Sequence, residues 1–241
     1  MSDAEPGPAS AADRAAWLRD LRRVNERQED ALAPDYDANW GRVGDTHRAF
    51  VERFLRLPPS GRVLDAACGT GKYFPLVLAS GRSLLGVDHT GAYLARAAAK
   101  FPGVPTGKHD LQELPYDDEF DGVLCVDAME FVPPEDWPPV LRRFRRALHP
   151  RGWLYLTVEL AHQEQVRAAN QAARRSGLPV VDGEVIWDEP DGYYHHYPSV
   201  RQVRAWLGGA GFAVEQEEEG LWHEEGYAYH HVLARAQVPP G

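Results

Sequence analysis

Four aspartates, each at the end of a predicted strand, are the side chains of this chain best suited to hold a polar ligand. They are Asp65, Asp88, Asp110 and Asp127. Carboxylates accept hydrogen bonds from hydroxyl and amino groups, and open α/β sheets bind ligands outside the carboxyl ends of their strands. Any one of these acids alone would be an ordinary turn residue. Four of them in sequence order predict one site along one edge of a sheet.

The loop 65–71, Asp-Ala-Ala-Cys-Gly-Thr-Gly, joins the first predicted strand to a helix. Its small residues let backbone N–H groups approach a ligand closely. The dinucleotide fingerprint fails because Ala67 and Lys72 stand where it needs glycine, and the Walker pattern fails at Tyr73. The Asp65 carboxylate would repel a pyrophosphate but suits a cationic, amine-bearing ligand. The loop therefore favours S-adenosylmethionine over NAD, with a ligand-free glycine-rich turn as the alternative.

Two of the other acids suit the remaining parts of such a ligand. Asp88 follows Asp65 at about the 20-residue spacing at which an acid accepts ribose hydroxyls. Asp110 can accept the adenine amino group while Leu111 covers the ring. These residues predict a site for a methylated adenosine.

At these positions the chain resembles the class I S-adenosylmethionine-dependent methyltransferases of the small-molecule type. The similar segments are 63–71, Asp88, Asp110-Leu111, 120–125, 141–156 and 210–214. The resemblance covers roughly residues 45–235. It is specific for the cofactor and the fold and says little about the substrate. Ala67 stands where glycine is more usual in the family, a departure that costs little unless the position needs a positive φ.

The resemblance also implies a set of cofactor-binding residues. They are Tyr36, Asp65, Ala67, Gly69, Gly71, Asp88, His89, Asp110, Leu111 and Cys125. Tyr36 is included because a tyrosine near this position often touches the cofactor in family members. The alternative for Tyr36 is packing at a helix junction.

The alternation of strand-like and helical segments predicts an α/β fold with a doubly wound, mostly parallel sheet. The resemblance implies seven strands in a Rossmann-like methyltransferase fold. An amphipathic helix is expected over 14–32, followed by a break at 34–40. The expected organisation is a disordered start (1–13), an N-terminal helical cover (14–60), a methyltransferase domain (61–235) with a lid insertion at 161–198, and a flexible tail (236–241).

The expected lid holds an unusual density of aromatic and imidazole side chains. Aromatic residues there would form a pocket for an apolar or aromatic acceptor, or would only seal the lid against the sheet. His195 and His196 are the candidate catalytic bases, because imidazole titrates near neutral pH. Asp127 and Glu159, at the ends of the fourth and fifth predicted strands, are the rivals. A second group near the last strand comprises Trp222, His223, Tyr227, Tyr229, His230 and His231.

No metal ion is expected. The pairs His195-His196 and His230-His231 lie in extended segments, where neighbouring side chains point to opposite faces, so neither pair alone can chelate an ion. Cys68 and Cys125 have no cysteine or histidine nearby at zinc spacing. Two such cysteines predict a reduced, cytoplasmic protein without a disulfide framework.

Charge and hydropathy narrow the choice of partners. A formal net charge of −10 disfavours nucleic acid, and the basic run at 142–146 is expected to be a solvated helix face. No apolar run approaches the ~20 residues of a membrane span, so no membrane partner is expected. The sequence leaves the oligomeric state open.

These observations predict an enzyme that transfers a methyl group from S-adenosylmethionine to a small-molecule acceptor, at oxygen or nitrogen, by in-line displacement. Two alternatives stay open. One is a relative that binds the cofactor structurally or catalyses another reaction, and the other is a methyltransferase that acts on a protein.

Overall fold

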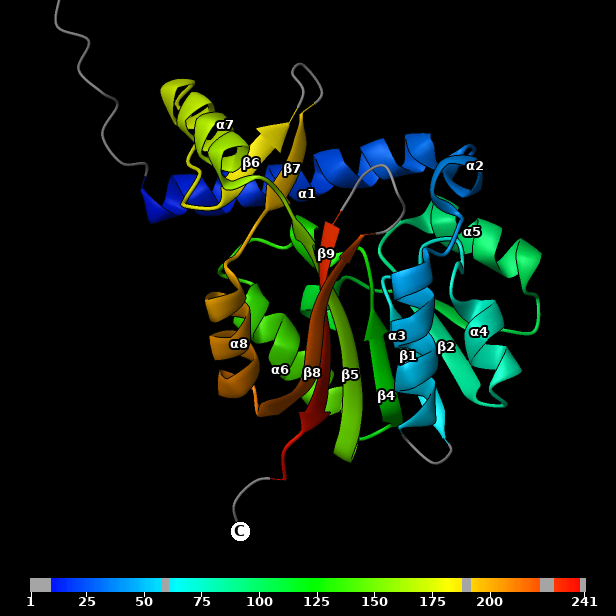
Figure 1. Cartoon of the computed structure of the whole chain (residues 1–241). Helices are drawn as coiled ribbons and strands as arrows, with labels where there is room; N and C mark the ends of the chain where they lie inside the picture. The colour runs from blue at the N-terminus through cyan, green and yellow to red at the C-terminus, as the bar shows by residue number, and fades with distance from the viewer. Residues whose placement is uncertain (1–9, 58–60, 188–191, 222–227, 239–241) are drawn as a thin grey trace, which may run out of the picture.

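The computed structural model describes residues 10–57, 61–187, 192–221 and 228–238. In these residues the strands form a seven-stranded sheet, in the order β3-β2-β1-β4-β5-β9-β8, and a separate two-stranded ribbon, β6-β7 (Figure 1). The strands are β1 (Arg62–Ala66), β2 (Ser83–Asp88), β3 (Thr106–Lys108), β4 (Phe120–Cys125), β5 (Leu148–Leu160), β6 (Glu184–Trp187), β7 (Tyr193–His196), β8 (Phe212–Leu221) and β9 (Ala228–Ala236). β9 runs antiparallel to β5 and β8, whereas β1 to β5 pair in parallel. The prediction of a mostly parallel sheet is confirmed.

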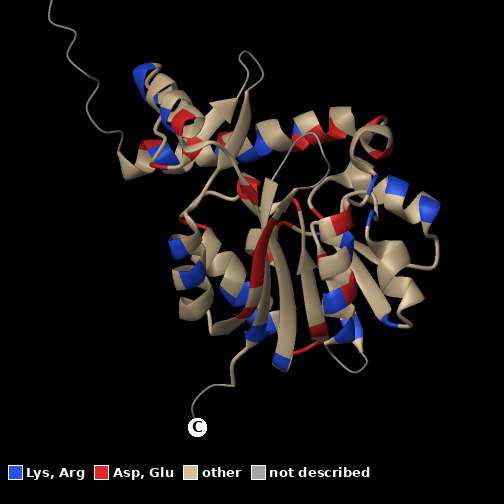
Figure 2. Cartoon of the chain, viewed as in Figure 1, with Lys and Arg blue, Asp and Glu red and all other residues tan. Residues whose placement is uncertain are grey.

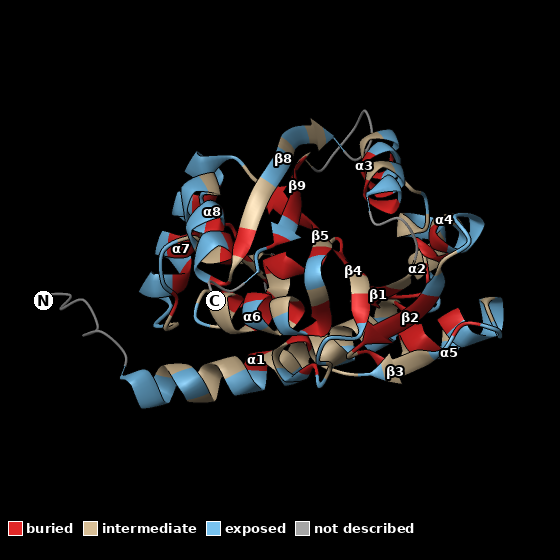
Figure 3. Cartoon of the chain, turned by 90° about the horizontal axis from the view of Figure 1, so that it is seen from below, coloured by how far each residue is buried: buried red, intermediate tan, exposed pale blue. Residues whose placement is uncertain are grey.

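Helices cover both faces of the sheet, as expected for a doubly wound fold. One face carries α3 (Asp45–Arg56), α4 (Phe74–Ala79) and α5 (Gly91–Lys100). The other face carries α6 (Trp137–Ala147) and α8 (Val200–Gly209). Figure 3 shows the buried residues concentrated in the strands and on the inner sides of these helices.

The sequence of α6 shows why it packs in this way. Trp137, Val140, Leu141 and Phe144 are all buried and recur at helical spacing, so they form one apolar stripe against the sheet. The arginines between them are half-buried or exposed. The arginines of the run 142–146 thus lie on the outer side of a core helix, as their spacing predicts.

The sheet reverses its winding between β1 and β4. From β1 the chain continues to β2 and β3 on one side, and from β4 it continues to β5 on the other. A switch point of this kind opens a crevice beyond the carboxyl ends of the strands. The four strand-end aspartates all lie along this edge.

Helix α1 (Ala11–Leu32) crosses above the carboxyl edge of the sheet (Figure 1). It begins before the predicted start at Arg14, because Ser10 and Asp13 form a capping box in which each side chain accepts the backbone N–H of the other residue. The segment predicted as a break contains a short helix, α2 (Tyr36–Trp40). Its first turn closes when the Asp35 carbonyl accepts two N–H groups further along the chain, each at 3.1 Å.

The predicted lid segment forms helix α7 (Gln163–Arg175) and the ribbon β6-β7. A buried ion pair fastens the ribbon to α1. The Arg14 guanidinium donates to the two carboxylate oxygens of Glu184 at 2.8 and 2.9 Å, and it also bonds Glu135. Glu184 is fully buried and accepts a further hydrogen bond from the Tyr194 hydroxyl at 2.6 Å.

Some predicted features lie outside the described residues, namely the chain up to residue 9, Trp222, His223, Tyr227 and residues 239–241. Within the described ranges, the search for a helix with the length and hydropathy of a membrane span finds none.

Candidate active site

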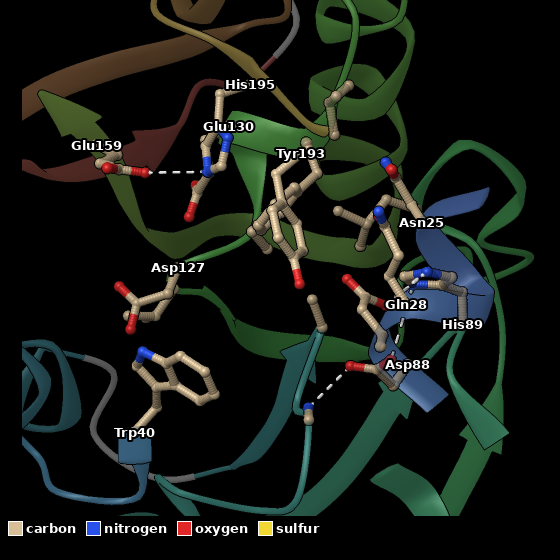
Figure 4. Close-up of a pocket in the computed structure, with 18 of the residues that line it drawn as sticks. Asn25, Gln28, Trp40, Asp88, His89, Asp127, Glu130, Glu159, Tyr193 and His195 are labelled. Atoms are coloured by element: carbon tan, nitrogen blue, oxygen red, sulfur yellow. Dashed lines mark hydrogen bonds and ion pairs between the residues drawn. The ribbon is translucent and has the colours of Figure 1, made fainter. Parts of the chain in front are cut away.

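A cavity of about 740 Å³ lies at the carboxyl edge of the sheet, beneath α1 and the lid ribbon. Its wall combines residues of α1 and α2, of the segments that follow β1 to β5, and of β7 (Figure 4). This volume is in the range of small-molecule sites. The sequence-predicted residues that line it are Tyr36, Ala67, Gly69, Asp88, His89, Asp110, Leu111 and His195. The structure does not place Asp65, Gly71, Cys125 or His196 in the wall.

Asp88 organises the loop after β1. Its two carboxylate oxygens accept the backbone N–H groups of Gly69 and Thr90, each at 2.8 Å. Burial raises the pKa of Asp88 above its usual range, although these two donors and His89 act against that shift. The Asp88 side chain therefore links the segments that follow β1 and β2. It lies in the part of the cavity wall where the sequence predicts the ribose site.

A carboxylate that the sequence analysis missed lies beside Asp88. Glu29, on α1, is 2.9 Å from His89 Nε2 and accepts a 2.5 Å hydrogen bond from the Thr90 hydroxyl. Burial lowers the pKa of His89, but the Glu29 carboxylate outweighs it and raises that pKa to about 9. The only sequence signal for Glu29 is its place on an amphipathic helix. Its proximity to Asp88 depends on how α1 crosses the sheet.

Asp65 corrects one step of the sequence argument. It lies at the end of β1 as predicted, but it is 1% exposed and behind the cavity wall. Its Oδ2 atom has no hydrogen-bond partner among the described residues. Burial, with the charge of Asp88 nearby, raises the pKa of Asp65 to about 8. Burial thus favours the protonated acid over the carboxylate, and the structure places Asp65 behind the wall and not on the cavity surface where the sequence predicts it.

We expect the unliganded protein to lose stability as the pH rises from about 6.5 to 8. In the folded protein Asp65 keeps its proton up to a pKa of about 8, whereas in the unfolded chain it has lost that proton above 3.8. One such group lowers the free energy of unfolding by about 1.4 kcal/mol for each pH unit between these two values. The raised pKa of His89 acts in the same direction between about pH 6.5 and 9, and that of Glu159 only up to about pH 7. Urea unfolding at several pH values measures the slope.

The variant Asp65→Asn isolates the contribution of Asp65 to this slope. Its unfolding free energy should fall less steeply with pH than that of the wild type, by about one proton. Asp117→Asn, at an exposed position, is the control and should keep the wild-type slope. Equal slopes for Asp65→Asn and the wild type would contradict the assignment.

The adenine end of the predicted site is built from the segment after β3. Leu111 and Asp110 line the cavity, and Asp110 accepts the backbone N–H of Gln112 at 3.0 Å. The ring of Tyr36 packs against Tyr93 with centroids 4.7 Å apart. Tyr36 therefore lines the cavity and also packs at a helix junction, and its contact with the cofactor stays a prediction.

Two predicted cofactor residues have other roles in the structure. Gly71 has a φ of +83°, and a side chain there would collide with Phe74 and Phe101. It shapes the loop without reaching the cavity. Cys125 is fully buried in β4, within the apolar core on the α6 side of the sheet.

Ala67 has a φ of +65°, in the left-handed region. The absence of glycine at this position is predicted to cost little unless a positive φ is needed, and the structure shows that it is needed. An L-residue in this conformation costs about 1 kcal/mol or more. The loop is thus held in a strained conformation at the cavity wall, as is common where backbone must face a ligand.

Asp127 is held as a charged group by two basic side chains. Its carboxylate is 3.1 Å from His47 Nε2 and accepts a 3.1 Å hydrogen bond from Lys72 Nζ. Burial alone would raise the pKa of Asp127, but Lys72 and His47 outweigh it and hold that pKa well below its usual range. Asp127 is therefore a poor proton acceptor, which weakens it as a rival base. Sequence reasoning assigned no role to His47 or to the Lys72 side chain.

Two glutamates and a histidine lie together at the other end of the cavity (Figure 4). Glu159 Oε2 is 3.5 Å from His195 Nε2. Burial and the Asp127 charge raise the pKa of Glu159 to about 7. Burial, followed by the charges of Glu159 and Asp127, raises the pKa of Glu130 well above its usual range. Burial lowers the pKa of His195 to about 4, so this imidazole is neutral at physiological pH.

The two candidate catalytic histidines point to opposite sides of β7. His195 faces the cavity, whereas His196 packs near Trp137 and Trp206, with ring centroids 6.3 and 6.1 Å apart. The expectation that His196 serves as a base is wrong on this geometry, because its ring is buried away from the cavity.

The histidines of β9 are separated in the same way. His230 lies 2.9 Å from a Glu217 oxygen, and His231 lies 2.8 Å from the Tyr155 hydroxyl. In the part of the chain that the structure describes, no group of three or more histidine, cysteine or acidic residues is arranged to hold a metal ion.

Comparison with known proteins agrees with this geometry. A family described as "Methyltransferase domain" matches residues 63–152. The crystal structure of Burkholderia thailandensis 1,6-didemethyltoxoflavin-N1-methyltransferase is similar at 16% identity and a TM-score of 0.68, covering 97% of this chain and 93% of that chain. At this identity the likeness shows the fold.

Two curated proteins are similar in sequence over part of the chain. One is the dTDP-4-amino-2,3,4,6-tetradeoxy-D-glucose N,N-dimethyltransferase of Saccharopolyspora spinosa, 30% identical over 99 residues, which are 40% of each chain. The other is the tRNA (carboxymethyluridine(34)-5-O)-methyltransferase of Arabidopsis thaliana, 30% identical over 149 residues, covering 59% of this chain and 34% of the relative. The chain thus spans less than half the length of either relative.

The domain match, the strand order and the loop after β1 define the fold of a class I S-adenosylmethionine-dependent methyltransferase. Residues 63–152 are a methyltransferase domain. The predicted family resemblance and fold are confirmed, and the domain match supports the predicted enzyme class and S-adenosylmethionine cofactor.

Proposed function

We propose that this chain transfers a methyl group from S-adenosylmethionine to a small-molecule acceptor held under the lid ribbon. The observation that carries the proposal is the single cavity of about 740 Å³. Asp88 and Asp110 line one end of this cavity, and Glu130, Glu159 and His195 line the other end. Donor and acceptor would therefore share one cavity.

The residues present fit the cofactor. Asp88 would accept the ribose hydroxyls, Asp110 would accept the adenine amino group, and Leu111 would cover the ring. The backbone of Gly69 reaches the wall of the cavity, where a glycine loop lets a ligand approach closely. Glu29 on α1 and His89, directly after β2, form an ion pair that also lines the cofactor end of the cavity.

When bound, the cofactor supplies an activated methyl group on a sulfonium. The chain contributes position and exclusion of water. Bringing two reacting groups into contact in the correct orientation lowers a barrier by up to about 7–11 kcal/mol. Helix α1 and the lid ribbon cover the cavity and reduce the access of water.

The cover over the cavity supports a small acceptor over a macromolecule. A polynucleotide would need an open groove with basic residues aimed at its phosphates. Figure 2 shows lysines and arginines scattered over the outer helices, and the formal net charge is −10. The acceptor end of the cavity presents the acids Glu130 and Glu159 instead.

The test uses the purified chain, methyl-labelled S-adenosylmethionine and a low-molecular-mass metabolite extract. We expect S-adenosylhomocysteine to accumulate and the label to enter a small molecule. Transfer RNA and total protein from the same cells serve as competing acceptors. Label found only in RNA or protein would overturn the small-molecule assignment. Failure of millimolar S-adenosylmethionine to give heat or a thermal shift would overturn the proposed function altogether.

A further inference from the structure

Two buried carboxylates in the cavity wall are not accounted for by cofactor binding. Glu130, in the short helix η2 (Met129–Phe131), is 3% exposed, and Glu159, at the end of β5, is 6% exposed. The Oε2 atom of Glu130 has no hydrogen-bond partner among the described residues. A buried acceptor without a donor costs free energy, so the site is arranged for a donor that a ligand would bring.

The described surroundings of the pair favour its protonated, uncharged form. The pKa of Glu130 and that of Glu159 are both raised, chiefly by burial and then by the acids near them. His195, the closest imidazole, is neutral at physiological pH because burial lowers its pKa. A cation placed beside the two carboxyl groups would lower both pKa values and would supply the missing hydrogen bond.

The pair lies away from the predicted ribose site. Glu159 ends β5, Asp88 ends β2, and β1 and β4 separate these two strands in the sheet. Figure 4 shows Glu130, Glu159 and His195 on one side of the cavity and Asp88 with His89 on the other. The acids therefore face the part of the cavity left for the acceptor.

Building on the proposed function, we propose that the acceptor is a basic amine, whose ammonium group is held by Glu130 and Glu159. The ammonium gives one proton to Glu159. The nitrogen lone pair then forms the bond to the methyl carbon as the carbon–sulfur bond breaks, and the positive charge passes from sulfur to nitrogen. The methylated ammonium leaves, and the proton on Glu159 returns to water.

The wall around the pair indicates the rest of the amine. Phe131, Trp187, Tyr193 and Tyr197 line the cavity beside His195. The rings of Phe131 and His195 have centroids 4.9 Å apart, and the Trp187 indole N–H donates to the Tyr197 hydroxyl at 3.0 Å. Aromatic faces attract a cation and cover apolar surface. An amine with an apolar or aromatic body fits this wall.

The test is calorimetric titration of 2-phenylethylamine, and of 2-phenylethanol as the neutral match, into protein saturated with S-adenosylhomocysteine. We expect the amine to bind and the alcohol to bind at least tenfold more weakly. Glu130→Gln and Glu159→Gln should each weaken amine binding about 10- to 100-fold while leaving S-adenosylhomocysteine affinity within about twofold. Glu164→Gln, an exposed change on α7, is the control. Thermal unfolding of each variant confirms that it is folded.

Three outcomes are distinguishable. Wild-type protein that binds the alcohol as well as the amine, or neither, overturns the amine proposal. A loss of S-adenosylhomocysteine affinity in the two glutamine variants would mean that the pair holds the cofactor's own amino group, which also overturns it. If S-adenosylhomocysteine does not bind the wild type at all, it is the proposed function that fails.

Discussion

Replacing Asp88 with alanine is expected to weaken S-adenosylmethionine binding by about 10- to 100-fold, equivalent to about 1.5–3 kcal/mol. Two effects add. The ribose hydroxyls would lose a charged acceptor, and the N–H groups of Gly69 and Thr90 would lose the carboxylate that fixes the loop after β1. Isothermal titration of the variant with S-adenosylmethionine measures the loss.

The unliganded stability of Asp88→Ala separates these two effects. Its unfolding free energy should drop by about 1–3 kcal/mol, because two buried N–H groups lose their acceptor. Asp20→Ala, at an exposed position on α1, should change neither affinity nor stability measurably. Unchanged affinity in Asp88→Ala would remove Asp88 from the cofactor site.

The second large effect is expected for Arg14→Met. Glu184 is fully buried, and the change removes the cation that it bonds at 2.8 Å. Taking one partner from a buried ion pair costs about 3–5 kcal/mol, which for a chain of this size lowers the melting temperature by on the order of 10 °C. Differential scanning calorimetry measures the shift. Because the ribbon β6-β7 carries His195, methyl transfer should fall as well.

A double variant tests whether this loss comes from the uncompensated charge. Arg14→Met with Glu184→Gln should recover part of the stability, since a neutral amide can still accept the Tyr194 hydroxyl. Arg174→Met, which breaks an exposed pair with Asp182, is the matched control and should cost under about 1 kcal/mol. Equal losses for Arg14→Met and Arg174→Met would show that the pair does not fasten the ribbon.

The sequence predicted the fold because its signals are local. Apolar strands, helices with one apolar stripe and a glycine loop each follow from a few neighbouring residues. The order of the strand-end acids was equally informative. Parallel strands bring their carboxyl ends to one edge, so Asp88 and Asp110 had to meet there. The domain boundaries drawn from the sequence stay predictions.

The parts that the sequence could not predict depend on contacts between distant segments. Glu29 reaches His89 and Thr90 only because α1 crosses the sheet edge. The charge of Asp65 was misjudged because burial, and not residue type, sets its pKa. The pairing of Lys72 with Asp127 likewise joins residues far apart in the chain.

The histidine pair shows an intermediate case. Alternation along a strand predicted that His195 and His196 would diverge, but it could not tell which of them would face the ligand. That choice depends on which side of β7 is turned to the core, where Trp137 and Trp206 already lie. The sequence therefore predicts that the two side chains point to opposite faces of β7, but not which of them faces the cavity.

Helix α1 bonds the segment after β2 through Glu29 and the ribbon β6-β7 through Arg14. A ligand that enters or leaves either end of the cavity should therefore disturb the same helix. Release of S-adenosylhomocysteine should thus be slower while the other ligand holds the ribbon β6-β7 in place. The position of α1 would then determine the order in which the two products leave.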